Sequence, residues 1–240
     1  MTILGPQRIT VGPELYYSVR KRSGGTEQEG DMWGGFLRYD RLKHRALYWG
    51  VEGYWAKGCL KGKSALGTTI LSVMTDSEIE GKLGWTLCYP LFSRRIVISP
   101  YCGYGYYYGK NHYRKPEEMP LTFYDRVEYF TTGFLAKYHL NPCWSVGLQF
   151  AGKWMFEGKN KVTGDPDGEE DFTIVMGNRT FYAAEIPITY KFLCCSRLVE
   201  AYVAPFIRTR RYGYRENFPI DFIDTRFRIY GLRFSFFLNF

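Results

Sequence analysis

Large apolar residues occupy every second position over most of this chain. In residues 78–89, Ile79, Leu83, Trp85 and Leu87 fall on one face, and most of the intervening positions are charged, small or polar. A period of two residues is typical of β-strands, in which successive side chains point to opposite faces. Helical periodicity is almost absent, so the pattern predicts an all-β chain.

The alternation predicts about ten strands, with eight as the alternative count. Most exceed ten residues, whereas strands of globular proteins usually run about 5–6 residues and a tilted strand that spans a bilayer needs about 9–11. Strand length therefore favours a membrane-spanning barrel. The predicted strands cover residues 7–22, 31–42, 45–58, 77–90, 94–109, 122–139, 142–157, 172–193, 197–212 and 222–240.

The connections between these strands alternate strictly between short and long. Short ones lie near residues 41–44, 91–93, 139–142 and 193–196. This order predicts an antiparallel up-and-down sheet with all short turns at one end, the short-turn end, and all long connections at the other, the long-loop end. No linker or low-complexity segment interrupts it, so residues 1–240 are read as one transmembrane β-barrel domain.

The tryptophans indicate which face of the barrel points outward. All six fall on the apolar face, most of them towards strand ends, and three tyrosines join them near the short-turn end. Girdles of Trp and Tyr are expected where a barrel wall meets lipid headgroups, so the apolar face is predicted to face lipid. The predicted girdle comprises Trp33, Trp49, Trp55, Trp85, Trp144, Trp154, Tyr39, Tyr89 and Tyr190.

The opposite face combines charges of both signs with many glycines. Glycine weakens an exposed strand, but inside a narrow barrel it makes room for long charged neighbours, which can pair across the lumen. The alternative is a solvated outer face on a soluble, lipocalin-like barrel that binds an apolar ligand. The predicted lumen residues are Glu14, Arg20, Arg38, Glu52, Glu80, Lys82, Lys153, Glu185, Lys191, Glu200, Arg208, Arg210 and Arg233.

Composition excludes some classes and leaves others open. No run of 18 or more apolar residues occurs, which excludes a transmembrane helix, although a membrane β-barrel has unremarkable mean hydropathy. The net charge of +8 suits an anionic partner, but no basic run with exposed stacking aromatics suggests nucleic acid. The start, MTILGPQRIT, does not read as a secretory signal, so either the protein is not exported or this is a mature chain with an added Met.

Residues that could carry chemistry are sparse. The six cysteines form no CxxC pair and only three histidines are present, so zinc is not expected, and free thiols are favoured over disulfides. The segment 164–171 offers Asp165, Asp167, Glu169 and Asp171 to Ca²⁺, but without EF-hand spacing it reads as a solvated turn. We expect no metal and no cofactor.

The last strand alternates apolar residues up to the carboxyl terminus. Phe234, Phe236, Leu238 and Phe240 share one face, with Tyr230 and Gly231 upstream. This strand resembles the last strand of small, porin-like outer-membrane β-barrel proteins of Gram-negative bacteria, which ends on Phe. The resemblance extends over nearly the whole chain as an architecture, although the missing signal peptide and the number of cysteines depart from it.

The resemblance implies residence in the bacterial outer membrane and recognition of the last strand by the β-barrel assembly machinery. Some barrels of this size hydrolyse lipid or peptide at the loop end, with His beside Asp or Ser. Here His44 and His139 are expected in short turns, and His112, in a long loop with Lys110, Arg114 and Lys115, has no evident partner.

We therefore expect a non-enzymatic outer-membrane barrel with a structural, adhesion or narrow-pore role and a charge-filled lumen. Its long loops would be available to an extracellular ligand. Arg226 and Arg228, outward above the apolar band, are expected to meet lipopolysaccharide phosphates, because Arg matches phosphate geometry. A barrel enzyme that hydrolyses lipid or peptide is the second alternative, after the soluble barrel.

Overall fold

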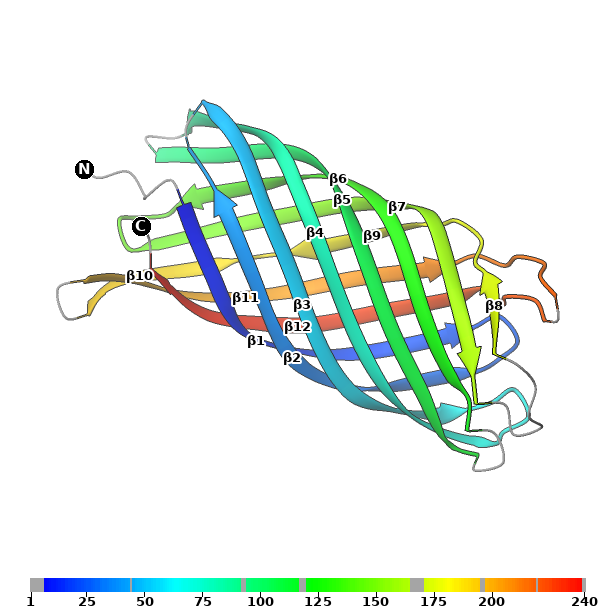
Figure 1. Ribbon diagram of the computed structural model, residues 1–240. Helices are drawn as coiled ribbons and strands as arrows, with labels where there is room; N and C mark the ends of the chain where they lie inside the picture. The colour runs from blue at the N-terminus through cyan, green and yellow to red at the C-terminus, as the bar shows by residue number, and fades with distance from the viewer. Residues whose placement is uncertain are drawn as a thin grey trace.

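The chain forms a closed antiparallel β-barrel (Figure 1). The computed structural model describes residues 7–43, 45–91, 94–116, 120–164, 171–194, 197–218 and 220–238. The strands are β1 (Gln7–Arg22), β2 (Glu27–Arg41), β3 (Ala46–Lys63), β4 (Thr69–Leu91), β5 (Arg94–Lys115), β6 (Thr122–His139), β7 (Trp144–Thr163), β8 (Phe172–Val175), β9 (Thr180–Glu185), β10 (Ile188–Cys194), β11 (Arg197–Tyr212) and β12 (Thr225–Leu238).

From β1 to β8 each strand pairs with the next along the chain, β10 pairs with β11 and β11 with β12, and β12 pairs back onto β1 to close the wall. β8, β9 and β10 occupy a single position in the wall, because all three pair with β7. We refer to them together as the broken strand β8–β10. Counted this way the barrel has ten strands, which confirms the predicted architecture and strand number.

The strands differ from the prediction mainly at the long-loop end. β1, β6 and β11 have the predicted bounds, but β2, β3, β4, β5 and β7 run several residues further at that end. Much of the segments 59–76 and 110–121, which lie between the predicted strands, is strand: residues 59–63, 69–76 and 110–115. The expectation of a long loop was wrong for His112, Lys110, Arg114 and Lys115, which all lie in β5.

These strands were predicted too short because their alternation of apolar and polar residues inverts along their length. In β3, Trp49, Val51 and Trp55 point outward in the half nearer the short-turn end, which we call the lower half. Lys57 and Lys61 point outward in the half nearer the long-loop end, the upper half. The inward positions change in the opposite sense, from polar to apolar. The upper wall therefore has the polar exterior and apolar interior of a water-soluble barrel. A prediction that relies on apolar outer faces does not detect these upper strand segments.

The apolar interior forms one large cluster in the upper barrel. Buried side chains from most strands meet there, including Met32, Leu60, Met74, Met176 and Ile229. Aromatic rings such as Tyr107, Tyr129, Tyr212 and Phe227 complete it. We call this cluster the apolar plug. In the described part of the chain, no helix has the length and apolar character needed to cross a bilayer.

Candidate functional site

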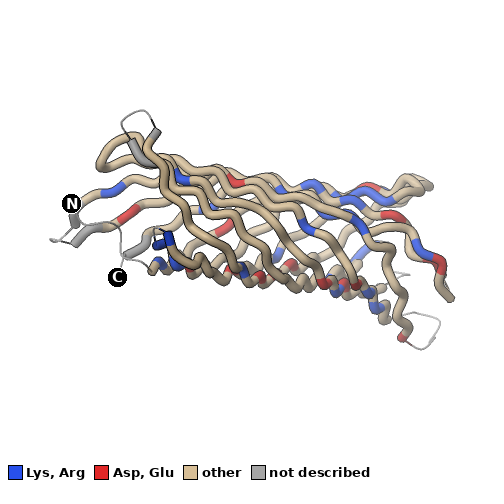
Figure 2. Tube along the Cα trace, turned by 90° about the horizontal axis from the view of Figure 1, so that it is seen from above, with Lys and Arg blue, Asp and Glu red and all other residues tan. Residues whose placement is uncertain are grey.

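Below the apolar plug, charged side chains of both signs fill the barrel interior. They come from strands all around the wall, and Figure 2 shows basic and acidic positions interspersed along it. Ion pairs within 4.0 Å join six carboxylates and six cations into one chain of contacts, which we call the lumen network. Its members are Glu14, Glu52, Asp76, Glu78, Glu80, Glu185, Arg38, Lys82, Lys153, Arg208, Arg210 and Arg233.

One end of the network is centred on Glu14, which is fully buried. Arg208 donates to both carboxylate oxygens of Glu14, at 2.9 and 2.8 Å. Arg233 donates its Nε–H to Oε2 at 2.5 Å. Two guanidinium groups thus satisfy one carboxylate, and the bidentate geometry with Arg208 is the strong form of this pair.

Arg233 continues the network to Glu52 and Glu185. Its Nη1 donates to Glu52 at 2.6 Å and to Glu185 at 2.7 Å. Arg38 bonds the same two carboxylates, each through two contacts of 3.1–3.2 Å. Two arginines and two glutamates therefore alternate around a square, in which each charge has two opposite charges beside it.

Lysines carry the network across to β4 and β7. Lys82 contacts Glu52 at 2.6 Å and Glu80 at 3.5 Å. Lys153 contacts Glu80 at 2.7 Å and also pairs with Glu78. The Tyr129 hydroxyl is placed 2.8 Å from Glu78 and 3.0 Å from Glu80.

The network ends at Asp76, beneath the apolar plug. Arg210 pairs with Asp76 at 3.4 Å and donates to the Tyr54 hydroxyl at 2.9 Å. The Tyr16 hydroxyl donates to Asp76 at 2.6 Å. The Arg210 guanidinium lies 3.5 Å from the centre of the Tyr107 ring. A cation–π contact of this kind joins the charged layer to the apolar plug.

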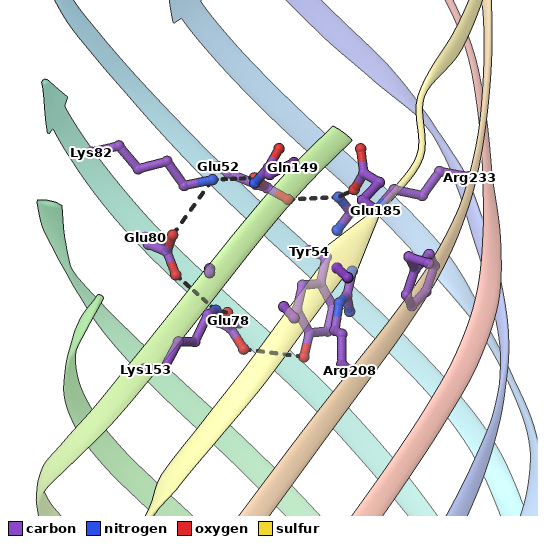
Figure 3. A pocket seen from close by; sticks show the side chains of 14 residues that line it. Glu52, Tyr54, Glu78, Glu80, Lys82, Gln149, Lys153, Glu185, Arg208 and Arg233 are labelled. Carbon is purple, nitrogen blue, oxygen red and sulfur yellow. Dashed lines mark hydrogen bonds and ion pairs between the residues drawn. The ribbon is translucent and has the colours of Figure 1, made fainter. Parts of the chain in front are cut away.

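A cavity of about 40 Å³ remains between these side chains (Figure 3). Charged members of the lumen network line it together with Gln149, Ala151, Ala183 and Ala184. Gln149 Oε1 is buried there and has no hydrogen-bond partner among the residues that the structure describes. The space suits a few water molecules, since one needs about 10–15 Å³, and is far smaller than a typical ligand pocket of about 300–1,000 Å³.

Most of the predicted lumen residues lie in this network, but three do not. Lys191 pairs with Glu200 at 3.3 Å in a separate group nearer the short-turn end. Arg20 projects inward above the network. The sequence reading also omitted Asp76 and Glu78 as site residues. Asp76 was placed in a loop, although it continues the inward face of Glu78, Glu80 and Lys82 at intervals of two.

The outer face carries the predicted aromatic residues. All six tryptophans are exposed there. Near the short-turn end the Tyr39 and Trp49 ring centres are 4.8 Å apart, and those of Trp144 and Tyr190 are 4.6 Å apart. Tyr89 is also exposed.

The last strand presents Tyr230, Phe234 and Phe236 outward, whereas Gly231 lies on the inner face. A side chain at Gly231 would meet the Phe206 ring at 2.5 Å. Leu238 ends β12, and Phe240 is outside the described residues.

The remaining candidates are dispersed. His112 Nδ1 lies 2.8 Å from Thr122 Oγ1, and His139 ends β6. Asp171 pairs with Lys161 at 2.9 Å. His44, Asp165, Asp167 and Glu169 fall outside the described residues. Where the chain is described, no three His, Cys, Asp or Glu side chains gather as a metal site would need.

Comparison with known proteins supports the fold. No protein-family profile matches the chain, and no curated protein matches it in sequence. The outer membrane protease OmpT from Escherichia coli has a similar structure, with a TM-score of 0.60 and 11% identity over 100% of this chain and 99% of that one.

Other solved structures match less well. The transport unit of the Escherichia coli autotransporter AIDA-I has a TM-score of 0.43 and 11% identity, over 95% and 90% of the two chains. The Pseudomonas putida toluene transporter TodX has a TM-score of 0.40 and 10% identity, over 100% and 91%. At these identities the likeness concerns the fold alone.

Proposed function

We propose that this chain is an integral outer-membrane β-barrel whose lumen is closed, and that it acts as a structural or adhesion scaffold. The exposed aromatic and aliphatic band around the lower wall supports membrane insertion, because such a continuous apolar surface is unfavourable in water. The similarity of fold to an outer membrane protein of Escherichia coli agrees with this location.

The interior carries the second part of the proposal. The lumen network pairs its charges across the barrel, and the apolar plug lies above it. A conducting ion would have to separate desolvated ion pairs and then cross the plug, and both steps are costly. A closed scaffold is therefore favoured over the narrow-pore role.

Planar-bilayer recording tests the closed lumen. The wild-type protein should insert without stable conductance steps. A Tyr107→Ala, Tyr129→Ala and Arg233→Ala variant removes three of the largest fully buried side chains and should conduct, which shows that the assay detects inserted protein. Stable unitary conductance from the wild type would contradict the closed lumen and favour the narrow pore.

Lipopolysaccharide is the proposed partner of the upper outer wall. Arg226 and Arg228 are exposed above the apolar residues of β12, and Arg226 Nε lies 3.4 Å from Asp224. Arg226→Ala with Arg228→Ala should weaken lipopolysaccharide binding to the purified barrel. Unchanged binding would remove these residues from the contact, and Arg41→Ala is the control because Arg41 lies at the opposite, short-turn end of the barrel, where β2 ends.

Recognition of the last strand by the β-barrel assembly machinery is also proposed. The exposed Phe234 and Phe236 are the residues on which it rests. Phe236→Ser should lower the amount of folded barrel in the outer membrane of a Gram-negative host. Leu47→Ser, on another strand's outer face, is the control.

Peptide hydrolysis is the second candidate, and only the fold shared with OmpT favours it. Incubation of the folded barrel with a mixed peptide library would reveal cleavage products. Cleavage that disappears on His112→Ala would overturn the non-enzymatic proposal.

A further inference from the structure

Arg20 and Arg22 project inward from the end of β1, above the apolar plug. Arg20 is 4% exposed, and its Nη1 donates to the neutral oxygens of Gln28 and Tyr113, each at 3.3 Å. Neither arginine has a carboxylate within 4.0 Å in the described part of the chain. Arg22 is half-buried at the rim, whereas Arg20 lies deeper.

The other inward cations of the described chain all have acidic partners. Arg8 pairs with Asp40 at 2.7 Å, and Lys137 and Lys191 both contact Glu200. The remaining ones belong to the lumen network. A buried guanidinium without a counter-ion is unfavourable, so Arg20 and Arg22 are exceptional in an interior that otherwise pairs its charges.

Aromatic rings hold the two guanidinium groups in place. Arg20 lies 5.5 Å from the Phe227 ring centre, and Arg22 lies 5.1 Å from that of Phe123. Phe123 in turn contacts Tyr113, with ring centres 5.3 Å apart. These rings orient the arginines without neutralising them.

Several polar atoms on the inner faces of β1 and β5 are buried without a hydrogen-bond partner in the described part of the chain. They include Nε of both arginines and both amide atoms of Asn111. Asn111 is 4% exposed and lies opposite Phe123 in the β5–β6 ladder. Asp125, the acidic residue on the inner face of β6, accepts a 2.5 Å bond from Asn160 instead of pairing with an arginine. Unused donors and an excess of positive charge thus meet at one place.

We infer that Arg20 and Arg22 bind an oxyanion, the phosphate or carboxylate group of a solute that enters from the long-loop end. Guanidinium groups match planar and tetrahedral oxyanions through paired N–H donors. The Asn111 amide supplies a further donor. The inner arginine and the rim arginine lie on the same face of β1, two residues apart, so one anion can lie between them.

Thermal unfolding of the detergent-solubilised barrel, free of lipopolysaccharide, tests this site. Sodium phosphate or acetate should raise the unfolding midpoint above that in sodium chloride of equal ionic strength. Arg20→Met and Arg22→Met should each abolish the difference. Arg126 is an outward arginine of β6. The Arg126→Met variant should keep the difference between the two salts, and it is the control for general effects of salt and of removing a positive charge.

Titration calorimetry with inorganic phosphate and with acetate provides a second measurement. Saturable binding to the wild type that is lost in Arg22→Met supports the site, and Arg22 is half-buried, so this variant is expected to fold. An equal rise of the midpoint in wild type and Arg20→Met would overturn the inference. If only lipopolysaccharide raised the unfolding midpoint, and did so equally in Arg20→Met and Arg22→Met, the anion would bind at the outer wall and the inference would be overturned.

Discussion

Arg233 is a central residue of the lumen network, because it forms ion pairs with three carboxylates: Glu14, Glu52 and Glu185. Arg233→Met should destabilise the barrel by about 3–5 kcal/mol, since it leaves buried carboxylates short of a partner. Urea unfolding in detergent micelles measures the effect. Arg228→Met, on the outward face of the same strand, should change stability by less than about 1 kcal/mol.

Gly105 makes room for the Tyr129 ring. A Cβ at Gly105 would lie 2.1 Å from Cζ of Tyr129, so Gly105→Ala should displace that ring from Glu78 and Glu80. We expect a loss of about 1–3 kcal/mol and a change in near-ultraviolet circular dichroism. Gly81→Ala is the matched control, because nothing lies within 4 Å of a Cβ there. Equal effects of the two substitutions would contradict this role.

The inward direction of Glu14, Arg38 or Arg233 follows from a period of two, so the sequence predicts it. Their partners do not follow from the sequence. Arg38 meets Glu185 across a separation of 147 residues, and that contact depends on the curvature and tilt of the closed wall. Arg20 shows the limit of the pattern, because its position in the alternation matches that of the paired arginines although it has no acidic partner among the described residues.

The broken strand β8–β10 is the weakest part of the wall. Among the described residues, β9 pairs with β11 over Phe206–Arg208 only, and β8 pairs with no strand other than β7. Backbone amides of Thr180–Glu185 should therefore exchange hydrogen faster than those of the doubly paired segment 78–84 in β4. Hydrogen exchange with mass spectrometry checks this, and equal protection of both segments would contradict it.

Asn217 substitutes for a neighbouring strand at the free edge of β8. The Val175 N–H donates to Asn217 Oδ1 at 2.8 Å, and Asn217 Nδ2 donates to the Val175 carbonyl at 2.9 Å. Asn217→Ala should accelerate exchange at Val175 because both bonds are lost. Asn141→Ala, which removes side-chain bonds in a short turn, should leave Val175 unchanged.

The sequence predicts the existence and the order of the strands well, because the half of each strand nearer the short-turn end carries large apolar residues on its outward face. It does not predict where β3, β4, β5 and β7 end. Their upper segments reverse the pattern, and polar outward residues such as Lys61 and Lys63 resemble loop residues. The breaks in β8–β10 were missed for a related reason, since alternation continues through residues 172–193 although pairing with β11 does not.

Three native cysteines test the position of the whole barrel in the membrane. Cys59 is an exposed thiol between outward lysines, Cys102 is exposed among outward apolar residues of β5, and Cys143 is exposed in a short turn. In single-cysteine variants reconstituted in liposomes, a membrane-impermeant maleimide should label Cys59 or Cys143 according to orientation, but not Cys102.

Detergent-free unfolded protein labelled at all three positions is the control for intrinsic reactivity. Rapid labelling of Cys102 in intact liposomes would contradict the membrane-embedded band. Labelling of Cys59 and Cys143 from the same side would contradict their location at opposite ends of the barrel.

The reversal of alternation along each long strand also protects the assembly from error. When a strand with one uniform alternation shifts by one residue against its neighbour, its apolar and polar side chains exchange faces in the same sense along its whole length. Here one such slip in β3 would bring Glu52 to the lipid side and turn Lys57 and Lys61 into the apolar plug at the same time. Both halves of a strand therefore favour the same register. A misaligned hairpin is unfavourable in lipid, where it exposes charge, and also in the barrel interior, where it buries charge.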